Sequence, residues 1–273
     1  MEQTIKRMRP SRVLQKMRAG EVAVCTKLNI GNARVAEIAA LSGIDCIWTD
    51  MEHVPNDWSA IESQINAAKM HNVDTVVRVA KGSYSDFIRP LEMDASGIMI
   101  PHVMNLAEAK SIVRSTKFHP IGLRPVDGGN ADGAYCEIEF IDYLQQANEQ
   151  RFNILQIEDP EPLDELEEII KLPGVDMIFF GPGDFTQAIG FPGQWDHPKL
   201  IETRRLIAKL AQKHAKFAGT VGSVSNWDEL VSLGYNFISV GADVVGLGNY
   251  YKQLLDDIKK KHTTTIDGIY SNN

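Results

Sequence analysis

Eight repeats of one pattern, a short apolar run followed by an amphipathic one, constrain the fold of this chain more than any other feature of its sequence. The apolar runs are rich in β-branched and aromatic residues, which is typical of buried parallel strands. We expect strands over residues 22–28, 45–49, 75–79, 97–103, 153–157, 177–181, 217–221 and 237–240. We expect helices over residues 33–42, 58–71, 84–91, 106–116, 162–171, 198–214, 227–233 and 246–259. Eight strands, each followed by a helix, predict an α/β fold, the (β/α)₈ TIM barrel, which typically needs about 250 residues.

The ends of these elements fit a single barrel domain over all 273 residues, with no linker between parts. Gly43, Gly174 and Gly234 each lie just before a strand, where a turn that ends a helix is needed. A short opening helix is expected over residues 11–18. The polar stretch from about Lys259 onward is expected to be a weakly ordered tail.

One segment interrupts the alternation. Residues 118–136 contain four glycines and two prolines and follow the helix after the fourth strand. A Gly-rich excursion of this length in a compact domain indicates a functional loop or a subunit contact. A further helix, expected over residues 138–148, leads into the fifth strand.

Charge and cysteine content narrow the class of partner. The chain has 28 basic and 36 acidic residues and a formal charge of -8, which argues against a nucleic-acid or anionic-membrane surface. Its apolar runs fall short of membrane-spanning length, and its N-terminal segment lacks the apolar core of a secretory signal. The three cysteines are scattered, which suits a reducing compartment. We expect a cytoplasmic protein that acts on a small molecule.

Two carboxylates stand just past two of the predicted strands. Glu158 follows the fifth strand, and Asp184 follows the sixth. Because the carboxyl ends of parallel barrel strands share one mouth, the two acids are expected to converge there. Two carboxylates suit a hard divalent cation, Mg²⁺ or Mn²⁺ with Co²⁺ as a third possibility, with water and substrate oxygens as the other ligands.

Other strand ends add a base and a cation to this mouth. His53 follows the second strand, and its ordinary pKa of about 6.5 suits proton transfer near neutrality. It could instead only bond Asp50 or Glu52 and tie the loop. Arg78 ends the third strand, where its guanidinium could hold a carboxylate or stabilise an enolate oxygen. A structural ion pair with Asp50 or Glu158 is the alternative.

The turn at residues 181–184 is expected to expose backbone N–H groups that could receive a substrate carboxylate. Its spacing differs from that of a nucleotide-binding loop. Lys27 and Lys81 are candidates for a Schiff base, but neither lies in an obvious apolar pocket that would lower its pKa, so imine chemistry is disfavoured.

At these positions the chain resembles the metal-dependent 2-keto-3-deoxy acid aldolases of the phosphoenolpyruvate/pyruvate barrel superfamily, typified by 4-hydroxy-2-oxoheptanedioate aldolase. The resemblance spans about residues 20–255 and rests on ordered motifs: Asp50-Met-Glu-His-Val-Pro55, Val76-Val-Arg-Val79, Ile98-Met-Ile-Pro101, Pro120-Ile-Gly-Leu-Arg124, Leu155-Gln-Ile-Glu158 and Gly181-Pro-Gly-Asp-Phe185. The Ile100-Pro-His-Val103 and Gln156-Ile-Glu-Asp-Pro160 forms also look like macrophomate synthase, a relative that decarboxylates oxaloacetate.

The resemblance implies a role for each matching residue. Glu158 and Asp184 would bind the metal, His53 would act as acid and base, and Arg78 would stand on the enolate. The substrate-binding residues implied with them are Gln156, His102, Gly181, Pro182, Gly183 and Asp184, the backbone after Gly-Pro holding the pyruvate carboxylate. Family members are commonly hexamers, trimers of dimers whose subunits exchange a C-terminal helix, and the same is implied here.

The chain departs from the family pattern in three places, of which Phe185 and Thr186, in place of the commoner Leu and Ser, are the mildest. Where relatives usually show Leu-Asp-x-Gly, this chain has Glu92 and Asp94 at the second and fourth positions. The family Asp is thought to support the catalytic histidine from a neighbouring subunit, and Glu92 would take that part with a longer side chain. Pro125 replaces the usual small residue after Gly-Leu-Arg and reshapes the loop near the mouth.

The sequence therefore predicts a divalent-metal-dependent aldolase that cleaves a 4-hydroxy-2-oxo acid to pyruvate and an aldehyde. Two alternatives stay open: decarboxylation of oxaloacetate, and a barrel that binds a 2-oxo acid without turnover.

Overall fold

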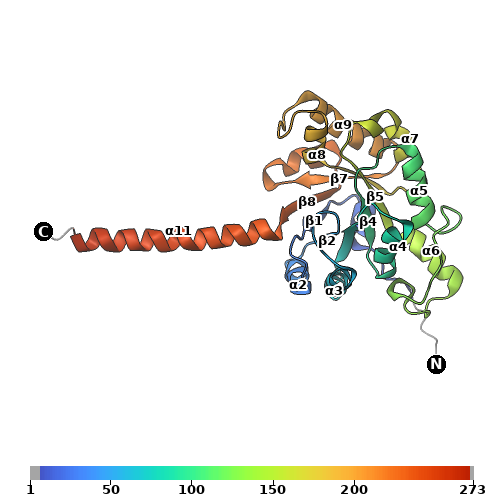
Figure 1. Ribbon diagram of the computed structural model, residues 1–273, viewed down its shortest axis with the longest axis horizontal. Helices are drawn as coiled ribbons and strands as arrows, with labels where there is room; N and C mark the ends of the chain where they lie inside the picture. Colours follow the sequence, from blue (N-terminus) through green and yellow to red (C-terminus); the bar gives the residue numbers. More distant parts are fainter. Residues whose placement is uncertain (1–6, 271–273) are drawn as a thin grey trace.

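The computed structural model describes the backbone of residues 7–270 and the side chains of residues 7–261, and it shows a closed ring of parallel strands (Figure 1). Each strand pairs with the next, and the last pairs with the first, so the sheet has no edge. The strands are β1 (Ala23–Lys27), β2 (Cys46–Asp50), β3 (Asp74–Arg78), β4 (Gly97–Ile100), β5 (Phe152–Ile157), β6 (Met177–Phe180), β7 (Phe217–Gly222) and β8 (Phe237–Ala242). The predicted (β/α)₈ barrel is confirmed.

Helices cover the outside of the ring (Figure 1). They are α1 (Arg12–Arg18), α2 (Ala33–Leu41), α3 (Trp58–Lys69), α4 (Tyr84–Glu92), α5 (Leu106–Thr116), α6 (Phe140–Gln150), α7 (Leu166–Ile170), α8 (Pro182–Ala188), α9 (Pro198–Lys213), α10 (Trp227–Leu233) and α11 (Asp243–Tyr270). Short 3-10 turns are η1 (Ala131–Gly133), η2 (Glu161–Glu165) and η3 (Val224–Asn226).

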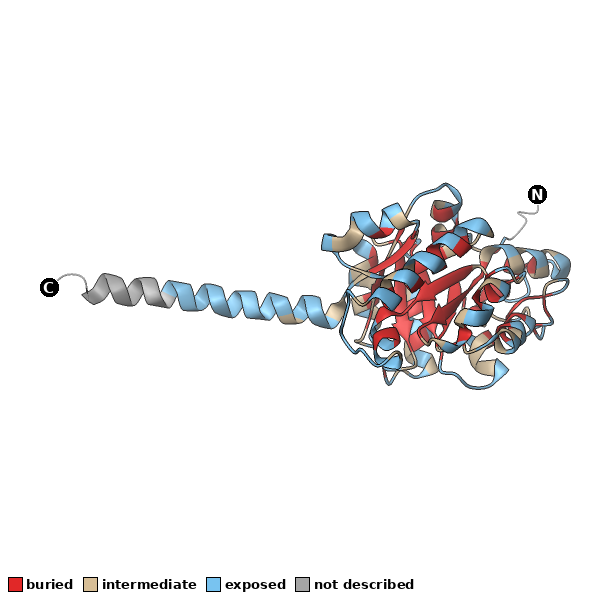
Figure 2. Cartoon of the chain, turned by 90° about the horizontal axis from the view of Figure 1, so that it is seen from above, coloured by how far each residue is buried: buried red, intermediate tan, exposed pale blue. Residues whose placement is uncertain are grey.

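Two apolar layers hold the barrel together, and Figure 2 shows the strands between them as the buried centre of the molecule. Inside the ring, Trp48 meets Phe179 edge-on with centroids 5.6 Å apart, and Met99 and Phe237 pack in the same cluster. Between strands and helices lies a larger cluster that includes Leu155. Because side chains fill the interior of the ring, it cannot serve as a pore or an internal ligand cavity, and a strand-end active site must lie at the mouth.

The segment around α1 covers the amino ends of the strands and is held there by ion pairs. Arg9 Nη1 lies 2.8 Å from Asp74, and Lys16 lies 2.8 Å from Asp45. Ser11 caps α1 by accepting from Leu14 N, as the sequence predicted for this opening helix.

Asp94, one of the departures from the family pattern, belongs to this closed end. Its backbone has φ 75, a conformation that glycine adopts without strain, which fits the glycine that the resemblance implies at this position. Its carboxylate lies 2.5 Å from Arg151 Nη2 and 3.1 Å from Lys69 Nζ. Aspartate at this position is less favourable than glycine for the backbone conformation, but its carboxylate gains a buried ion pair with Arg151.

The predicted element ends are largely confirmed, with three corrections. Gly43, Gly174 and Gly234 have φ of 89, 88 and 102, the left-handed turns expected of them. The fourth strand ends at Ile100, three residues earlier than predicted, because Pro101 has no N–H to continue the ladder. The helix expected over residues 162–171 is a 3-10 turn followed by the short α7.

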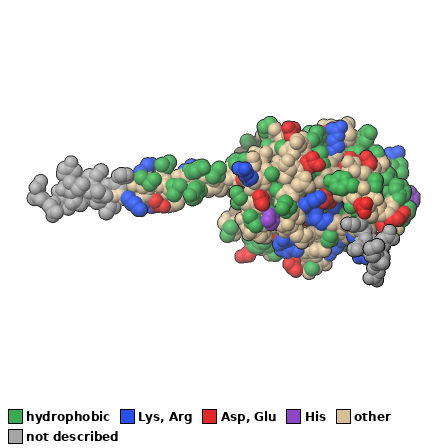
Figure 3. Space-filling view, turned by 90° about the horizontal axis from the view of Figure 1, so that it is seen from below, with side chains coloured by type: hydrophobic (Ala, Val, Ile, Leu, Met, Phe, Trp, Pro, Cys, Tyr) green, Lys and Arg blue, Asp and Glu red, His purple; other side chains and the backbone are tan. Residues whose placement is uncertain are grey.

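The third correction concerns the C-terminal helix. Helix α11 begins at Asp243 rather than at residue 246 and continues to Tyr270, past the predicted end at residue 259. Weak order of the polar tail stays a prediction, and residues 271–273 lie outside the described residues. It points away from the barrel (Figure 1). Apolar side chains that include Leu247, Tyr250 and Leu254 are exposed along it, as Figure 3 shows for the part nearest the barrel. Within the described part of the chain, no helix has the length and apolar character needed to cross a membrane.

Candidate active site

The mouth of the barrel gathers the polar strand-end residues that the sequence singled out. Asp50 and Arg78 end β2 and β3, Glu158 follows β5 by one residue, and Gly181 follows β6 directly. All these strands are parallel, so their carboxyl ends face the same side.

A buried carboxylate with two cations forms one half of the mouth. Asp50 is fully buried and accepts hydrogen bonds from Arg78 Nε at 3.0 Å and Nη2 at 2.6 Å, while Lys27 Nζ lies 2.9 Å from its Oδ2. Burial alone would raise the pKa of Asp50, but the hydrogen bonds and charges of Arg78 and Lys27 lower it to about 2. Both cations lie over the indole ring of Trp48, 4.8 Å and 5.3 Å from its centroid.

The loop after β2 adds Glu52 and His53. Glu52 Oε2 lies 2.9 Å from Arg78 Nη1, and the backbone N–H of Glu52 donates to Asp50 Oδ1 at 3.0 Å. His53 Nε2 lies 3.6 Å from Glu52 Oε2, with 60% of the His53 side chain exposed. Arg78 is therefore paired with Asp50 and Glu52 rather than with Glu158, and His53 stands beside Glu52 with its ring open to an incoming ligand.

His102 joins the two halves of the mouth. Its φ of 48 turns the chain after β4 so that its backbone N–H donates to Glu158 Oε1 at 3.0 Å. Its ring Nδ1 lies 2.7 Å from Asp159 Oδ2, and Nε2 lies 3.7 Å from both Glu158 Oε1 and Glu52 Oε1. Burial lowers the pKa of His102, but the Asp159 hydrogen bond and the surrounding carboxylates outweigh it and raise the pKa above its usual value.

Glu158 is the most perturbed acid of the mouth. Only 1% of it is exposed, and Gln156 Nε2 donates to its Oε2 at 2.5 Å. Burial, followed by the negative charges of Asp184 and Glu52, raises its pKa to about 7 against the opposing pull of His102. A carboxyl in this environment gains most from a bound cation.

The residues 181–184 form the start of helix α8 rather than an isolated turn, which corrects the sequence prediction. Pro182 occupies the first helical position, where its missing N–H is no loss. A Cβ on Gly181 would lie 2.4 Å from Glu158 Oε2, so this residue must be glycine for Glu158 to fit. At Gly183 a Cβ would meet nothing within 4 Å, which leaves open space beside Asp184 in the first turn.

The donors at this point fit a divalent cation. Glu158 and Asp184 supply carboxylate oxygens, and the buried Oε1 of Gln156 has no hydrogen-bond partner. Hard oxygen donors of this kind suit Mg²⁺ or Mn²⁺. The described residues contain no group of three or more His, Cys, Asp or Glu arranged to hold a metal ion.

Glu92 lies away from these residues within the chain. It lines a pocket on the helical wall with Trp58, Arg89 and Tyr135. Burial raises its pKa, with Arg124 opposing and nearby acids adding to the rise. The sequence placed Glu92 at a neighbouring subunit's histidine, and its position on the outer wall leaves that a prediction.

The Gly-rich segment folds against that wall through one buried ion pair. Arg124 Nη2 lies 2.9 Å from Asp132 Oδ2, and Tyr143 Oη donates to the same oxygen at 2.9 Å. Residues 134–136 follow with three consecutive positive φ values. The segment is thus an ordered loop outside the mouth.

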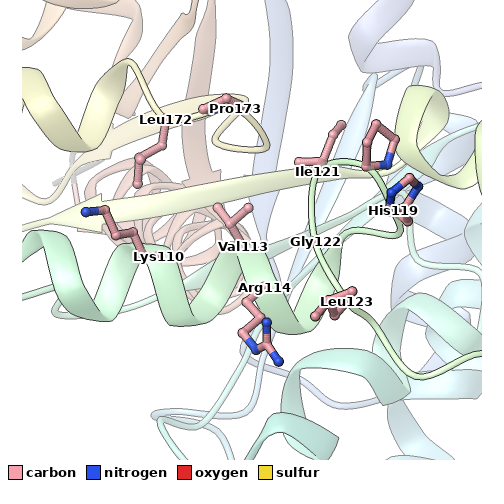
Figure 4. A pocket seen from close by; sticks show the side chains of 10 residues that line it. Lys110, Val113, Arg114, His119, Ile121, Gly122, Leu123, Leu172 and Pro173 are labelled. Carbon is pink, nitrogen blue, oxygen red and sulfur yellow. The ribbon is translucent and has the colours of Figure 1, made fainter.

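A cavity of about 520 Å³ lies on the outside of the barrel, beside α5 (Figure 4). Val113, Ile121 and Leu172 form its apolar wall, and Lys110 and Arg114 stand at its edge. None of the predicted site residues lines it, so the chemistry of the mouth does not extend there.

Comparison with known proteins shows the family of this chain. The chain matches the HpcH/HpaI aldolase/citrate lyase family over residues 28–249. It is 31% identical over 261 residues to the 2-keto-3-deoxy-L-rhamnonate aldolase of Escherichia coli, a match that covers 94% of this chain and 96% of that enzyme. The crystal structure of an HpcH/HpaI aldolase from Desulfitobacterium hafniense superimposes with a TM-score of 0.84 at 27% identity, over 90% of this chain and 96% of the other.

The family match and the aldolase relative identify the chain as a carbon–carbon lyase. The chain belongs to the HpcH/HpaI aldolase/citrate lyase family, as its motifs predicted. Macrophomate synthase has the same fold, with a TM-score of 0.81 at 24% identity over 93% of this chain and 90% of that one.

Sequence reasoning missed two partners at the mouth. Asp159 holds the ring of His102, although its place directly after Glu158 was a usable signal. Lys27 was considered only for imine chemistry, whereas it pairs with Asp50; Lys81 pairs with Glu108 at 2.7 Å. All three contacts join strands or loops that are distant in sequence, and only the closed barrel brings them together.

Proposed function

We propose that this protein is a divalent-metal-dependent pyruvate aldolase that cleaves a 4-hydroxy-2-oxo acid to pyruvate and an aldehyde. The observation that carries the proposal is the position of Glu158 at the mouth, where 1% of it is exposed, Gly181 leaves no space for a Cβ beside its Oε2, and the Oε1 of Gln156 has no hydrogen-bond partner. Burial raises the pKa of this carboxyl to about 7, and a divalent cation would compete with the proton there.

Glu158 and Asp184 would hold the cation, which would be Mg²⁺, Mn²⁺ or Co²⁺. When bound, a divalent ion supplies Lewis-acid polarisation of the keto group and charge stabilisation for the pyruvate enolate. The first turn of α8 leaves room at Gly183 for the carboxylate of the 2-oxo acid, and Gly181 and Pro182 set the start of that turn.

Arg78 is oriented to stabilise the enolate oxygen. A guanidinium has five N–H donors. Three of them face Asp50 Oδ1, Asp50 Oδ2 and Glu52 Oε2, so two N–H groups stay available for a ligand. Because the pair with Asp50 is bidentate and buried, the plane of the guanidinium is set before substrate arrives, which is what preorganised electrostatic stabilisation requires.

His53 would remove the proton of the 4-hydroxyl group and return it to the enolate carbon. Its ring is mostly exposed at the mouth and lies near Glu52, which can hold one ring nitrogen while the other faces the substrate. His102, with a raised pKa and Asp159 behind it, would hold a positive charge beside the bound 2-oxo acid.

A second candidate is decarboxylation of oxaloacetate at the same site. The His102–Asp159 pair favours it, since both residues belong to the motifs that look like macrophomate synthase. Loss of CO₂ also leaves a pyruvate enolate, so the same groups would serve.

The quaternary proposal is a cytoplasmic homohexamer, a trimer of dimers. Helix α11 supports it, because it projects from the barrel with exposed apolar residues such as Leu247 and Leu254. A cavity of about 500 Å³ at the base of that helix, lined by Leu28, Ile38 and Leu247, would accept part of a second copy's helix. Glu92 would then reach the mouth of a neighbouring subunit.

The test is Glu158→Gln, which keeps size and removes the charge. Cation binding, measured by calorimetry with Mn²⁺ alone, should be lost, together with exchange of pyruvate methyl protons in D₂O and cleavage of aldol adducts. Glu168→Gln, at an exposed acid paired with Lys171 on the outer wall, is the matched control and should behave as the wild type. Full turnover by Glu158→Gln, or by thoroughly chelated protein, would refute the proposal. Supplying oxaloacetate in parallel separates decarboxylation from aldol cleavage.

A further inference from the structure

Lys27 is a cation of the mouth that the proposed reaction does not use. It ends β1, and its Nζ lies 2.9 Å from Asp50 Oδ2 and 5.3 Å from the centroid of the Trp48 ring. Asp50 accepts two N–H groups from Arg78, and Lys27 is a second cation on the same carboxylate. The contact with Asp50 uses only part of the hydrogen-bonding capacity of the ammonium group.

Lys27 has hydrogen-bond donors that its contact with Asp50 does not use. Lys27 and Arg78 together oppose Asp50 and Glu52, so the cluster is neutral before substrate arrives. An ammonium has three N–H donors, and the contact with Asp50 uses one of them. The Lys27 side chain is 21% exposed, so the remaining donors can meet a ligand that enters the mouth.

The position of Lys27 on the ring decides which part of a substrate it meets. In the closed order β1 to β8, β1 stands opposite β5, the strand that leads to Glu158. If Glu158 and Asp184 hold the 2-oxo end, an acid long enough to cross the mouth would bring its far end, the part that leaves as the aldehyde, toward the β1 side and Lys27.

Hydrogen bonds and close packing from two sides hold the loop after β1, next to Lys27, in place. The carboxylate of Asp243 accepts from the backbone N–H of Asn29 and of Ile30, both at 2.8 Å. Asn56 donates from Nδ2 to the backbone oxygen of Asp50 at 2.8 Å and packs so closely on Gly31 that a Cβ there would lie 2.0 Å from its Oδ1. A lysine held on such a frame can select among ligands, because the frame does not have to be ordered on binding.

We propose that Lys27 binds a carboxylate at the far end of the substrate and so makes the enzyme select 2-oxo acids with two carboxylates over those with a neutral end. The proposal rests on the proposed function for the orientation of the substrate. The indole ring of Trp48 lies beneath the ammonium group and holds it in place by a cation–π contact. The ring has no hydrogen-bond acceptor that would compete with the ligand for the ammonium N–H groups.

The test uses ligands that cannot be cleaved, so that binding is read apart from turnover. Calorimetry with Mn²⁺-loaded protein compares 2-oxoglutarate, 2-oxoadipate and 2-oxopimelate with the monocarboxylates of equal chain length, 2-oxopentanoate, 2-oxohexanoate and 2-oxoheptanoate. At one length or more, the wild type should prefer the dicarboxylate by about 10- to 100-fold, the range expected for a hydrogen bond to a charged group.

Two variants assign the preference to the lysine. Lys27→Met should reduce the dicarboxylate preference to about unity, whereas Lys27→Arg should keep most of it, because the charge is retained. Lys171→Met, at a lysine paired with Glu168 on the outer wall, is the matched control and should keep the wild-type ratio. The result is the ratio of the affinity for the dicarboxylate to the affinity for the monocarboxylate. Loss of the Asp50 contact that weakens both ligand classes equally leaves this ratio unchanged.

The outcomes are distinct. A wild type with no dicarboxylate preference at any length overturns the proposal, and so does a preference that survives in Lys27→Met. An equal loss of affinity for both ligand classes in Lys27→Met would make the lysine a positioning residue for Arg78 and would also overturn it. If no 2-oxo acid binds and pyruvate protons do not exchange, the proposed function has failed instead.

Discussion

The two ends of the barrel both gather charged side chains, but they use them differently. At the base, Asp45, Asp74 and Asp94 each hold two or more donors, and Arg151 is buried against Asp94. At the mouth, burial and then the nearby carboxylates Asp184 and Glu52 raise the pKa of Glu158 to about 7. At the base, each aspartate is paired with cations or other donors, and these contacts stabilise the fold. At the mouth, the carboxylates around Glu158 exceed the cations beside them, so a bound cation would stabilise them.

The largest expected effect on stability would come from removing the ion pair between Asp94 and Arg151 at the base of the barrel. Asp94→Gly removes the acceptor of Arg151 and should lower the free energy of unfolding by about 3–5 kcal/mol, because a buried charge loses its partner. This should hold although glycine suits φ 75 better than aspartate does. Urea unfolding measures it, with Asp94→Asn as the variant that keeps an acceptor and loses only the charge. A change below about 1 kcal/mol would show that the base does not depend on this pair.

The matching change at the mouth should affect turnover more than stability. Arg78→Lys keeps a positive charge near Asp50 but loses the fork of donors, and kcat/KM for aldol cleavage should fall about 10²- to 10³-fold. Steady-state kinetics with a 4-hydroxy-2-oxo acid measures this, and Arg114→Lys, at an exposed arginine of the outer wall, is the control. Retention of wild-type kcat/KM would remove Arg78 from the proposed reaction.

The pH dependence of the metal-free protein tests the crowding at Glu158. Its pKa is raised from 4.5 to about 7, so the folded state binds a proton that the unfolded state releases between these values. Stability should therefore fall as pH rises from about 4.5 to about 7, by about 3 kcal/mol in total. Urea unfolding across this range, compared with Glu158→Gln, isolates the contribution, and saturating Mn²⁺ should abolish it. Parallel pH profiles of the two proteins would contradict the explanation.

Asp50 should show the opposite sign at lower pH and with smaller size. Burial would raise its pKa, but Arg78 and Lys27 lower it from 3.8 to about 2, so its stabilisation is present above the unfolded value and is lost as pH falls toward about 2. The loss should be about 2 kcal/mol. Acid unfolding of Asp50→Asn should lack this part of the pH dependence. Equal dependence in both proteins would mean that the two cations do not hold this carboxyl ionised.

Much of this molecule could be predicted from local patterns. The alternation of apolar and amphipathic runs predicted all eight strands, and Gly43, Gly174 and Gly234 marked turns whose positive φ values the structure confirms. Helix α8 was missed because Gly-Pro-Gly-Asp reads locally as a turn, and it becomes helical only when the following residues pack against β6. The extension of α11 to Tyr270 was missed for a related reason, since a polar helix has little periodicity to reveal it.

The sequence by itself determined the barrel, the family and the residues that reach the mouth, because strand period and strand ends are local properties of a chain. The tertiary structure alone decided how those residues pair. It set Arg78 on Asp50 and Glu52 instead of Glu158, His102 against Asp159, and Lys27 across the ring from Glu158. The reason is physical: a pKa or an ion pair depends on distances between elements, and these exist only once the ring has closed.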